Sequence, residues 1–326
     1  MNRTTTYKPG LAWFAVLGSA WVFVLVALGA FTTSIGAGMA FADWPLSNGS
    51  VNPHGWLEEI DKFAEHSHRL SASLMGAITL ILAGWLHRTE ARAWLRRLGW
   101  FTVGLVILQG VVGGLRVLLD QQHIDMVNTS VGRLFAMLHA FLAQAFVCAL
   151  IALAVACSRP WIERNAGLSA APSERVRRLG LWCVALFFMQ LIIAAVVRHS
   201  FAGLAIPTFP YSTAENGLLP AVWNFPVVIQ LAHRIMAALI GGMILLLGHF
   251  LWRERAASPL LRGSGLLLVG LIALQITLGA QIIWTGRGVS MTTSHVLLGA
   301  LTLAATFLVT FVLHRGSLET PAGTAP

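Results

Sequence analysis

The sequence predicts an all-α polytopic membrane protein, with eight transmembrane helices arranged as two pseudo-symmetric four-helix bundles. Three observations lead to this fold class. The 326 residues are 56% hydrophobic and 11% charged, with a mean hydropathy of +0.73, whereas a soluble domain carries about 25% charged residues. Eight apolar stretches each have the length of about 20 residues that a membrane-spanning helix needs. The second half of the chain also repeats the polar landmarks of the first.

The eight expected spans contain few strongly charged residues, namely Arg69, Arg116 and Arg234, and each of these lies near a helix end. The first span follows a short basic segment but is too long for the apolar core of a signal peptide, so we expect an uncleaved helix. The spans are expected at residues 11–33, 67–86, 98–118, 134–157, 178–197, 227–251, 264–284 and 291–313.

The distribution of basic residues sets the expected orientation. With the N-terminus inside, the inner segments hold 15 of the 22 lysines and arginines. This asymmetry favours both termini in the cytoplasm, because positive residues collect on that side of a membrane. It also accounts for the formal charge of +9 without nucleic acid. The three cysteines are not in CxxC pairs, which gives no disulfide framework, zinc spacing or covalent haem attachment.

An internal repeat divides the chain. The expected outer loops 34–66 and 198–226 contain Gly38–Ser47 and Gly203–Ser212, which share Gly, Ala, Pro and Ser at matching positions and an aromatic residue before the proline. Because matching helices run in the same direction, the repeat is parallel, about an axis along the membrane normal. The landmarks that follow in the same order are His68-Arg69 and His233-Arg234, then Gln109 and Gln275, then Gly113 and Gly279, then His139 and His295.

We therefore expect an N-terminal half at 1–160, a cytoplasmic linker at 161–177 and a C-terminal half at 178–315. Residues 316–326 are expected to form a disordered tail.

The four repeated histidines, His68, His139, His233 and His295, each fall in the first residues of a span on the outer side. An ionisable residue in a span is a functional candidate, although a single histidine near a helix end can simply bind a neighbour. Haem iron accepts two axial imidazoles, and helix bundles hold such cofactors. Copper or zinc is the rival, but either needs three or four donors, and no thiolate or carboxylate cluster completes a set.

Small and basic residues beside these histidines fit the same hypothesis. Glycines at 110, 113, 114 and 279 leave room for a macrocycle, or allow close helix packing. Arg69 and Arg234 are placed to pair with haem propionates, or to reach toward the interface.

One residue breaks the repeat. Glu65 precedes His68 by three residues and shares its helix face, whereas the second half has Gln230 before His233. A carboxylate in a desolvated site can relay protons, which predicts one site for chemistry and one for electron transfer. Alternatively, Glu65 is an exposed loop residue after the acidic run at 58–61. Four further histidines receive no role: His54, His66, His123 and His199.

These residues resemble the haem A synthase family over nearly the whole chain, and Glu65-x-x-His68-Arg69 is the most specific match. The resemblance implies oxidation of the C8 methyl of haem O to a formyl group, through an alcohol, to give haem A for cytochrome oxidase. It implies that His233 and His295 ligate a resident haem b, and that His68 and His139 hold haem O. Glu65 is then the catalytic residue, which takes a proton or positions water.

The family further implies a bacterial inner (cytoplasmic) membrane location. The expected partners are haem O, a haem O synthase that supplies it, an unidentified electron donor or acceptor, membrane lipid and a second copy in a homo-oligomer. Some bacterial members carry an outer-loop cysteine pair that this sequence lacks, so no thiol-based step carries over.

Two other functions compete with this one. A quinol-linked di-haem cytochrome b would also explain paired histidines, but such proteins usually stack haems across the membrane, whereas these histidines share one depth. A transporter would explain the repeat and leave the histidine pairs without a role.

Overall fold

The computed structural model describes residues 3–125 and 129–319 of the chain. Eight of its helices are long and apolar enough to cross a membrane, which confirms the expected number of spans. They are α1 (Pro9–Ser34), α2 (Ile60–Thr89), α3 (Ala93–Leu118), α4 (Val131–Cys157), α6 (Glu174–His199), α7 (Phe225–Arg253), α8 (Pro259–Trp284) and α9 (Val289–Leu313). The short elements are β1 (His123–Ile124), β2 (Thr129–Ser130), α5 (Arg159–Glu163), η2 (Asn165–Gly167), η3 (Ala202–Leu204) and α10 (Arg315–Glu319).

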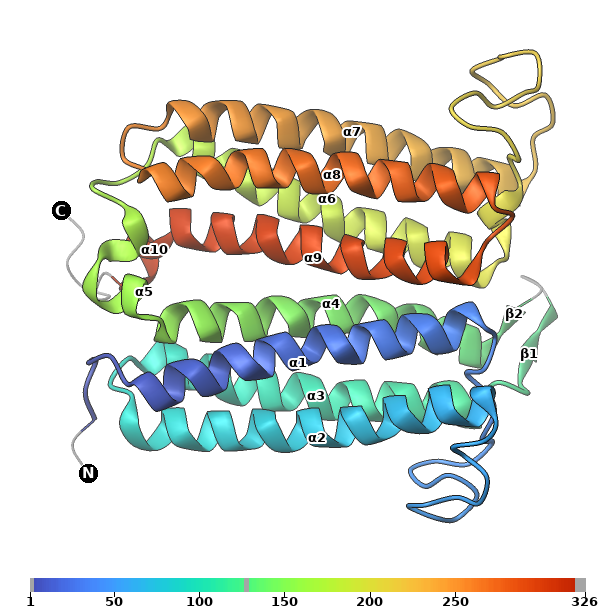
Figure 1. The fold of residues 1–326 in the computed structure, drawn as a ribbon, viewed down its shortest axis with the longest axis horizontal. Coiled ribbons are helices and arrows are strands. Elements are labelled where there is room, and N and C mark those ends of the chain that lie inside the picture. The colour runs from blue at the N-terminus through green and yellow to red at the C-terminus, as the bar shows by residue number, and fades with distance from the viewer. Residues whose placement is uncertain (1–2, 126–128, 320–326) are drawn as a thin grey trace.

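The long helices form two four-helix bundles with the same arrangement (Figure 1). In the first, α1, α2, α3 and α4 pack in that order around a ring, so α2 and α4 lie diagonally opposite each other. In the second, α6, α7, α8 and α9 repeat this order, with α7 and α9 on the diagonal. The bundles meet through α1 against α9 and α4 against α6, which are equivalent contacts, and through α4 against α9. The two pseudo-symmetric halves are therefore as expected.

Several helices extend beyond the apolar stretches that predicted them. The largest extension is in α2, which begins at Ile60, whereas the apolar stretch begins at residue 67. Hydropathy marks only the lipid-facing part of a helix, and polar residues with helical propensity continue the same hydrogen-bond ladder beyond it. Other starts are fixed by side-chain caps: Ser130, Asn224 and Ser258 each accept a backbone N–H of the first turn of α4, α7 and α8.

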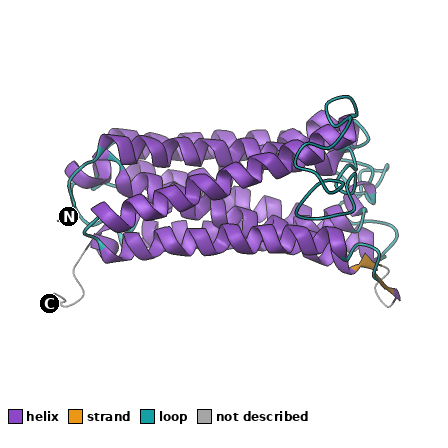
Figure 2. Ribbon diagram, turned by 90° about the horizontal axis from the view of Figure 1, so that it is seen from below, coloured by secondary structure: helices purple, strands orange, loops and turns teal. Residues whose placement is uncertain are grey.

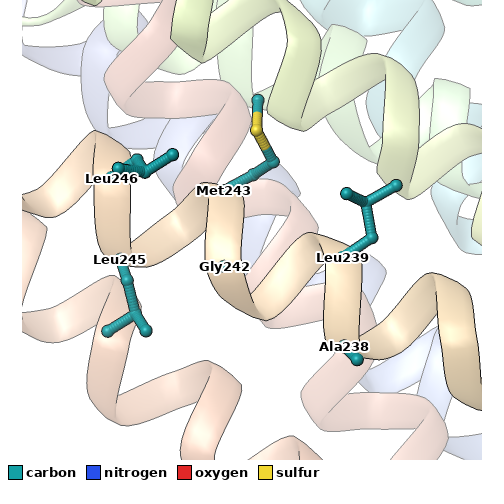
Figure 3. A pocket seen from close by; sticks show the side chains of 6 residues that line it. All are labelled: Ala238, Leu239, Gly242, Met243, Leu245 and Leu246. Atoms are coloured by element: carbon teal, nitrogen blue, oxygen red, sulfur yellow. The ribbon is translucent and has the colours of Figure 1, made fainter.

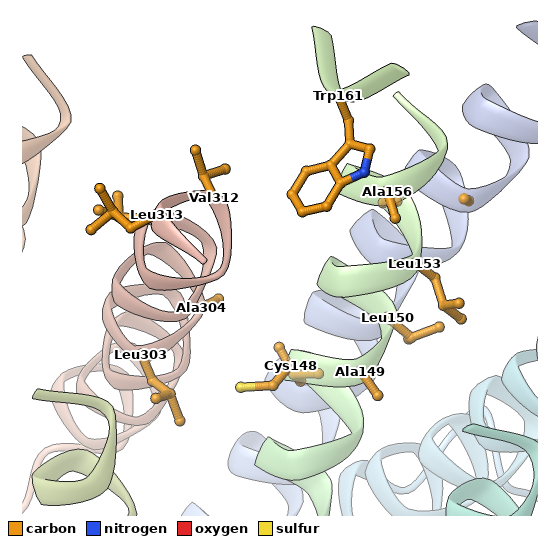
Figure 4. Packing of buried hydrophobic residues seen from close by; sticks show 14 of the residues in the cluster. Cys148, Ala149, Leu150, Leu153, Ala156, Trp161, Leu303, Ala304, Val312 and Leu313 are labelled. Carbon is orange, nitrogen blue, oxygen red and sulfur yellow. The ribbon is translucent and has the colours of Figure 1, made fainter. Parts of the chain in front are cut away.

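The core lies between the halves, because α4 and α9 are covered on more sides than the other spanning helices. Leu150 and Leu153 of α4 are buried here with Leu303 and Leu313 of α9, and Trp161 of α5 closes one end of the cluster (Figure 4). The three cysteines are buried and free. Many outward-facing side chains of the spanning helices are large and apolar, as in Leu266 of α8, which is 65% exposed; a surface of this kind is stable in lipid.

The long connections collect at one end of the molecule, here called the loop end (Figures 1 and 2). The first long loop, 35–59, leads into α2, and the second long loop, 205–224, leads into α7. The β1–β2 hairpin, which leads into α4, lies at this end too, whereas α5 and α10 lie at the opposite end.

The C-terminal boundary differs from the expected one. A disordered tail from residue 316 was predicted, but residues up to Glu319 belong to α10. The Glu319 carboxylate accepts hydrogen bonds from the Trp161 indole at 2.6 Å and from Arg92 at 3.0 Å. Those two partners fix this segment, and a sequence scan could not anticipate them because they are distant in the chain. Residues 320–326 lie outside the described residues. Within the expected linker 161–177, α6 already begins at Glu174.

Candidate functional site

The four repeated histidines lie on the diagonal helices of the two bundles, near the loop end. His68 of α2 faces His139 of α4, with ring centroids 6.5 Å apart and ring planes at 72°. This separation is comparable with that of two imidazoles sharing one metal ion through bonds of about 2 Å. In the second half, His233 and His295 occupy the equivalent helices, α7 and α9. All four side chains are half-buried.

Glycines make room for these rings in the same way in both halves. A Cβ at Gly113 of α3 would lie 3.2 Å from Cε1 of His139, and a Cβ at Gly279 of α8 would lie 3.3 Å from Cε1 of His295. Gly29 of α1 gives His68 similar room, at 2.9 Å. The other two glycines singled out in the sequence behave differently. Gly114 accommodates the Trp44 ring of the first long loop, and Gly110 faces open space.

The polar surroundings of the histidines differ between halves. The amide nitrogen of Gln190 lies 3.1 Å from Nδ1 of His233, and that of Gln275 lies 3.3 Å from Nε2 of His295. Each amide also donates to the backbone carbonyl of the same histidine. The Nδ1 atoms of His68 and His139, and that of His295 in the second half, are buried without a partner among the described residues. Glutamine side chains therefore contact the second pair, and none contacts the first pair among the described residues.

Glu65 is a buried residue of α2 and not an exposed loop residue, since only 4% of it is accessible. Its Oε1 accepts a hydrogen bond from Arg69 at 2.5 Å in an ion pair. Its Oε2 accepts the backbone N–H of Phe41 at 3.1 Å. The carboxylate therefore holds the first long loop against α2 and has one donor on each oxygen.

Gln230 occupies the equivalent position in the second half and makes the equivalent loop contact. Its Oε1 accepts the backbone N–H of Ile206, and its Nε2 donates to the Gly203 carbonyl at 2.7 Å. Both ends of this amide are thus used to fasten the second long loop. The two residues share a structural role, and the carboxylate at Glu65 adds the ion pair with Arg69.

Arg69 and Arg234 have equivalent partners in the two loops. Their guanidinium groups donate to backbone carbonyls at matching positions: Phe41, Asp43 and Leu46 for Arg69, and Ile206, Thr208 and Tyr211 for Arg234. The structure thus gives both arginines a loop-anchoring role. Their expected contact with haem propionates stays a prediction.

His66 of α2 also helps to hold the first long loop. Its Nδ1 lies 3.0 Å from the Ser47 hydroxyl, and its ring packs edge-on against Trp56 at 4.8 Å. Asp43 stabilises the same loop by accepting the backbone N–H groups of Asn48 and Gly49, each at 2.8 Å. Burial raises the pKa of Asp43, but these hydrogen bonds outweigh it and leave the pKa below its ordinary value.

Other parts of the described chain offer no competing donor set. Among residues 3–125 and 129–319, no three His, Cys, Asp or Glu side chains come together to hold a metal ion. A depression on α7 is lined by residues without polar side chains, so it presents no side-chain ligand of the His, Cys or carboxylate type for iron (Figure 3). Its residues are Ala238, Leu239, Gly242, Met243, Leu245 and Leu246.

Comparison with known proteins places this architecture in a family. The model of the COX15-CtaA family, described as cytochrome oxidase assembly proteins, matches residues 12–307. The chain belongs to this family. It is 27% identical over 292 residues to the heme A synthase of Geobacillus kaustophilus, covering 88% of this chain and 86% of the relative. It is 29% identical over 273 residues to that of Symbiobacterium thermophilum, covering 82% and 83%.

A third relative, the heme A synthase of a Methylobacterium strain, is 27% identical over 324 residues, covering 86% of this chain and 87% of the relative. These relatives favour the haem A synthase resemblance over the di-haem cytochrome alternative.

Sequence reasoning missed Gln190 as a site residue. The available signal was a single amide inside the otherwise apolar stretch of α6.

Proposed function

We propose that this protein is a haem A synthase, which oxidises the C8 methyl of haem O to a formyl group through an alcohol. His68 and His139 are the axial ligands of haem O in the N-terminal half. His233 and His295 would hold the iron of a resident haem b in the C-terminal half. The observation that carries this proposal is a pair of histidines on diagonal helices in each half, with a carboxylate beside one pair.

The residues present fit a haem in several respects. Ligands from opposite helices of a bundle can approach an iron from its two faces. Gly113 and Gly279 keep the space beside His139 and His295 free of side-chain atoms. The unpartnered Nδ1 atoms of His68, His139 and His295 are buried polar groups of the kind that a bound group explains. A bound haem b supplies one-electron chemistry, while the protein orients it and sets its surroundings.

The assignment of the halves follows from their differences. Gln190 and Gln275 donate to the backbone carbonyls of His233 and His295 and so hold the backbone that carries these two ligands. This arrangement suits a haem that stays bound. The N-terminal pair lacks these contacts, as suits a molecule that enters and leaves.

Glu65 is the residue for proton transfer. A carboxylate has about four lone-pair sites, and one donor on each oxygen leaves capacity to bind water or take a proton. Gln230 holds its loop in the same way, but an amide cannot accept that proton. The divergence of these two positions therefore separates an oxidising site from an electron-transfer site.

The basic residues of the inner segments support a location in the bacterial inner membrane with both termini cytoplasmic. The loop end then faces away from the cytoplasm. Haem O is apolar, so a site that opens toward the lipid suits its entry, with a haem O synthase as its supplier. The electron donor or acceptor is a separate partner, and a homo-oligomer is compatible with this arrangement.

The test is Glu65→Gln in cells that make haem O and supply electrons. Because Gln230 shows that an amide can hold the equivalent loop, the variant should fold and keep its haem. Haem A in the extract should fall about a hundredfold, in line with the loss of one general acid–base group. Glu59→Gln, which alters an exposed ion pair with Lys62, is the control and should behave as wild type. Failure of the wild-type protein to form any formylated haem would overturn the proposal.

A further inference from the structure

Arginines gather at the loop end without carboxylate partners. Arg116 of α3, Arg133 of α4, Arg198 of α6 and Arg287 before α9 form no ion pair within the described residues. Arg198 donates to the neutral Ala30 carbonyl and Ser34 hydroxyl, and Arg133 lies over the Phe201 ring. The Arg116 guanidinium makes no hydrogen bond to the part of the chain that the structure describes. A partly buried cation without a partner is costly, and such residues mark binding sites.

Arg116 lies beside the N-terminal histidine pair. It follows Gly113 by three residues on α3, so both lie on the same side of the helix. Gly113 borders His139, and the Arg116 guanidinium rests against Gly38, where any Cβ would collide with it. The charge of Arg116 acts on His68 and His139, and the charges of Glu65 and Asp120 act on Arg116. Neither carboxylate whose charge acts on Arg116 forms an ion pair with it: Glu65 is paired with Arg69, and Asp120 accepts a hydrogen bond from Ser130.

We propose that Arg116 binds a carboxylate of the porphyrin held between His68 and His139, that is, one of its propionates. This proposal rests on the proposed function and adds a residue to its substrate site. A guanidinium is suited to the task because it can grip a carboxylate with two parallel hydrogen bonds. The second half has no counterpart, since the residue three positions after Gly279 is Ile282.

This contact supplies an orientation that the histidines cannot. Two axial ligands fix the plane of a porphyrin but leave it free to turn about the axis through the iron. An anchored propionate stops that rotation and determines which edge of the ring faces Glu65. Arg116 is therefore a positioning residue that selects one methyl group among several.

The experiment is an absorbance titration of purified protein with haem O and with its propionate dimethyl ester. Arg116→Gln should weaken haem O binding at the N-terminal pair about tenfold or more, and haem b content should stay unchanged. The ester should bind wild type about as weakly as haem O binds Arg116→Gln. It should bind Arg116→Gln no more weakly than it binds wild type. Arg97→Gln, at the exposed opposite end of α3, is the control and should bind haem O as wild type does.

Equal affinity of wild type and Arg116→Gln for haem O would overturn the inference. So would an ester that binds Arg116→Gln more weakly than it binds wild type, because the losses of affinity from esterification and from substitution would then add. If Arg116→Gln fails to keep haem b, Arg116→Lys and the ester titration of wild type decide instead. Lysine should restore part of the affinity because it keeps the charge without the paired geometry. Failure of the proposed function would give a different result. Wild-type protein would then either not bind haem O or bind it equally well after His68→Ala.

Discussion

Single glycines decide whether the histidine rings have space to bind anything. Gly113 and Gly279 face His139 and His295 at nearly equal distances, although they lie in different halves. A substitution at either position tests one site while leaving the other as an internal control. The repeat thus allows residue-level predictions that a single site would not.

Gly113→Val should displace His139 and weaken haem O binding about tenfold, because overpacking of this kind costs roughly 1–3 kcal/mol. Haem b content should be unaffected. Gly279→Val should do the reverse and reduce haem b content. Gly104→Val on α3, where nothing lies within 4 Å, is the control. Absorbance spectra and extracted pigment measure both sites, and loss of the same haem in both variants would contradict separate sites.

Between elements, side chains from the helices hold the long loops. Arg69 and Glu65 hold the first long loop, and Arg234 and Gln230 hold the second through backbone groups at matching positions. The sequence alignment of the two loops predicted the repeat but not this role. The sequence gives the depth and charge of both arginines, which predicts propionate contacts, but it does not give the path by which each loop folds back over its helix.

A second connection between elements lies at the opposite end, where Glu90 and Arg92 join α2 to α3. The ion pair is buried, at 3.0 Å, and Arg92 also pairs with Glu319 of α10. Burial raises the pKa of Glu90, but the hydrogen bonds and charge of Arg92 lower it more, so the pKa lies below its ordinary value of 4.5. A carboxylate of this kind stabilises the fold above its unfolded pKa, and that contribution is lost as pH falls through its folded pKa.

Glu90→Gln should therefore lower stability at neutral pH by about 3 kcal/mol, because it leaves a buried charge poorly compensated. Acidification from neutral pH to about pH 4 and below should lower the thermal midpoint less in this variant than in wild type. Thermal unfolding in detergent measures both effects. Glu163→Gln, which removes an exposed pair with Arg159, should change little. If acidification lowers the thermal midpoint of Glu90→Gln as much as that of wild type, another group governs the loss of stability in acid.

At the scale of the whole molecule, hydropathy and the repeat were sufficient to predict eight helices in two bundles. The repeat also placed His68, His139, His233 and His295 at one depth. Contacts between distant residues were beyond sequence reasoning. Gln190 reaches His233 from a neighbouring helix, and Glu319 reaches Arg92 across the chain. Periodicity gives the face of each helix but not the partner that this face meets.

The central claim is that the two halves hold different haems, one resident and one substrate. It is tested most directly by extracting and identifying the haems from purified wild-type, His68→Ala and His233→Ala proteins. Wild type should contain haem b together with haem O or A. His68→Ala should keep haem b and lose the O and A types, and His233→Ala should lose haem b. A protein that holds only haem b, or a His233→Ala variant whose haem b content is unchanged, would contradict the account.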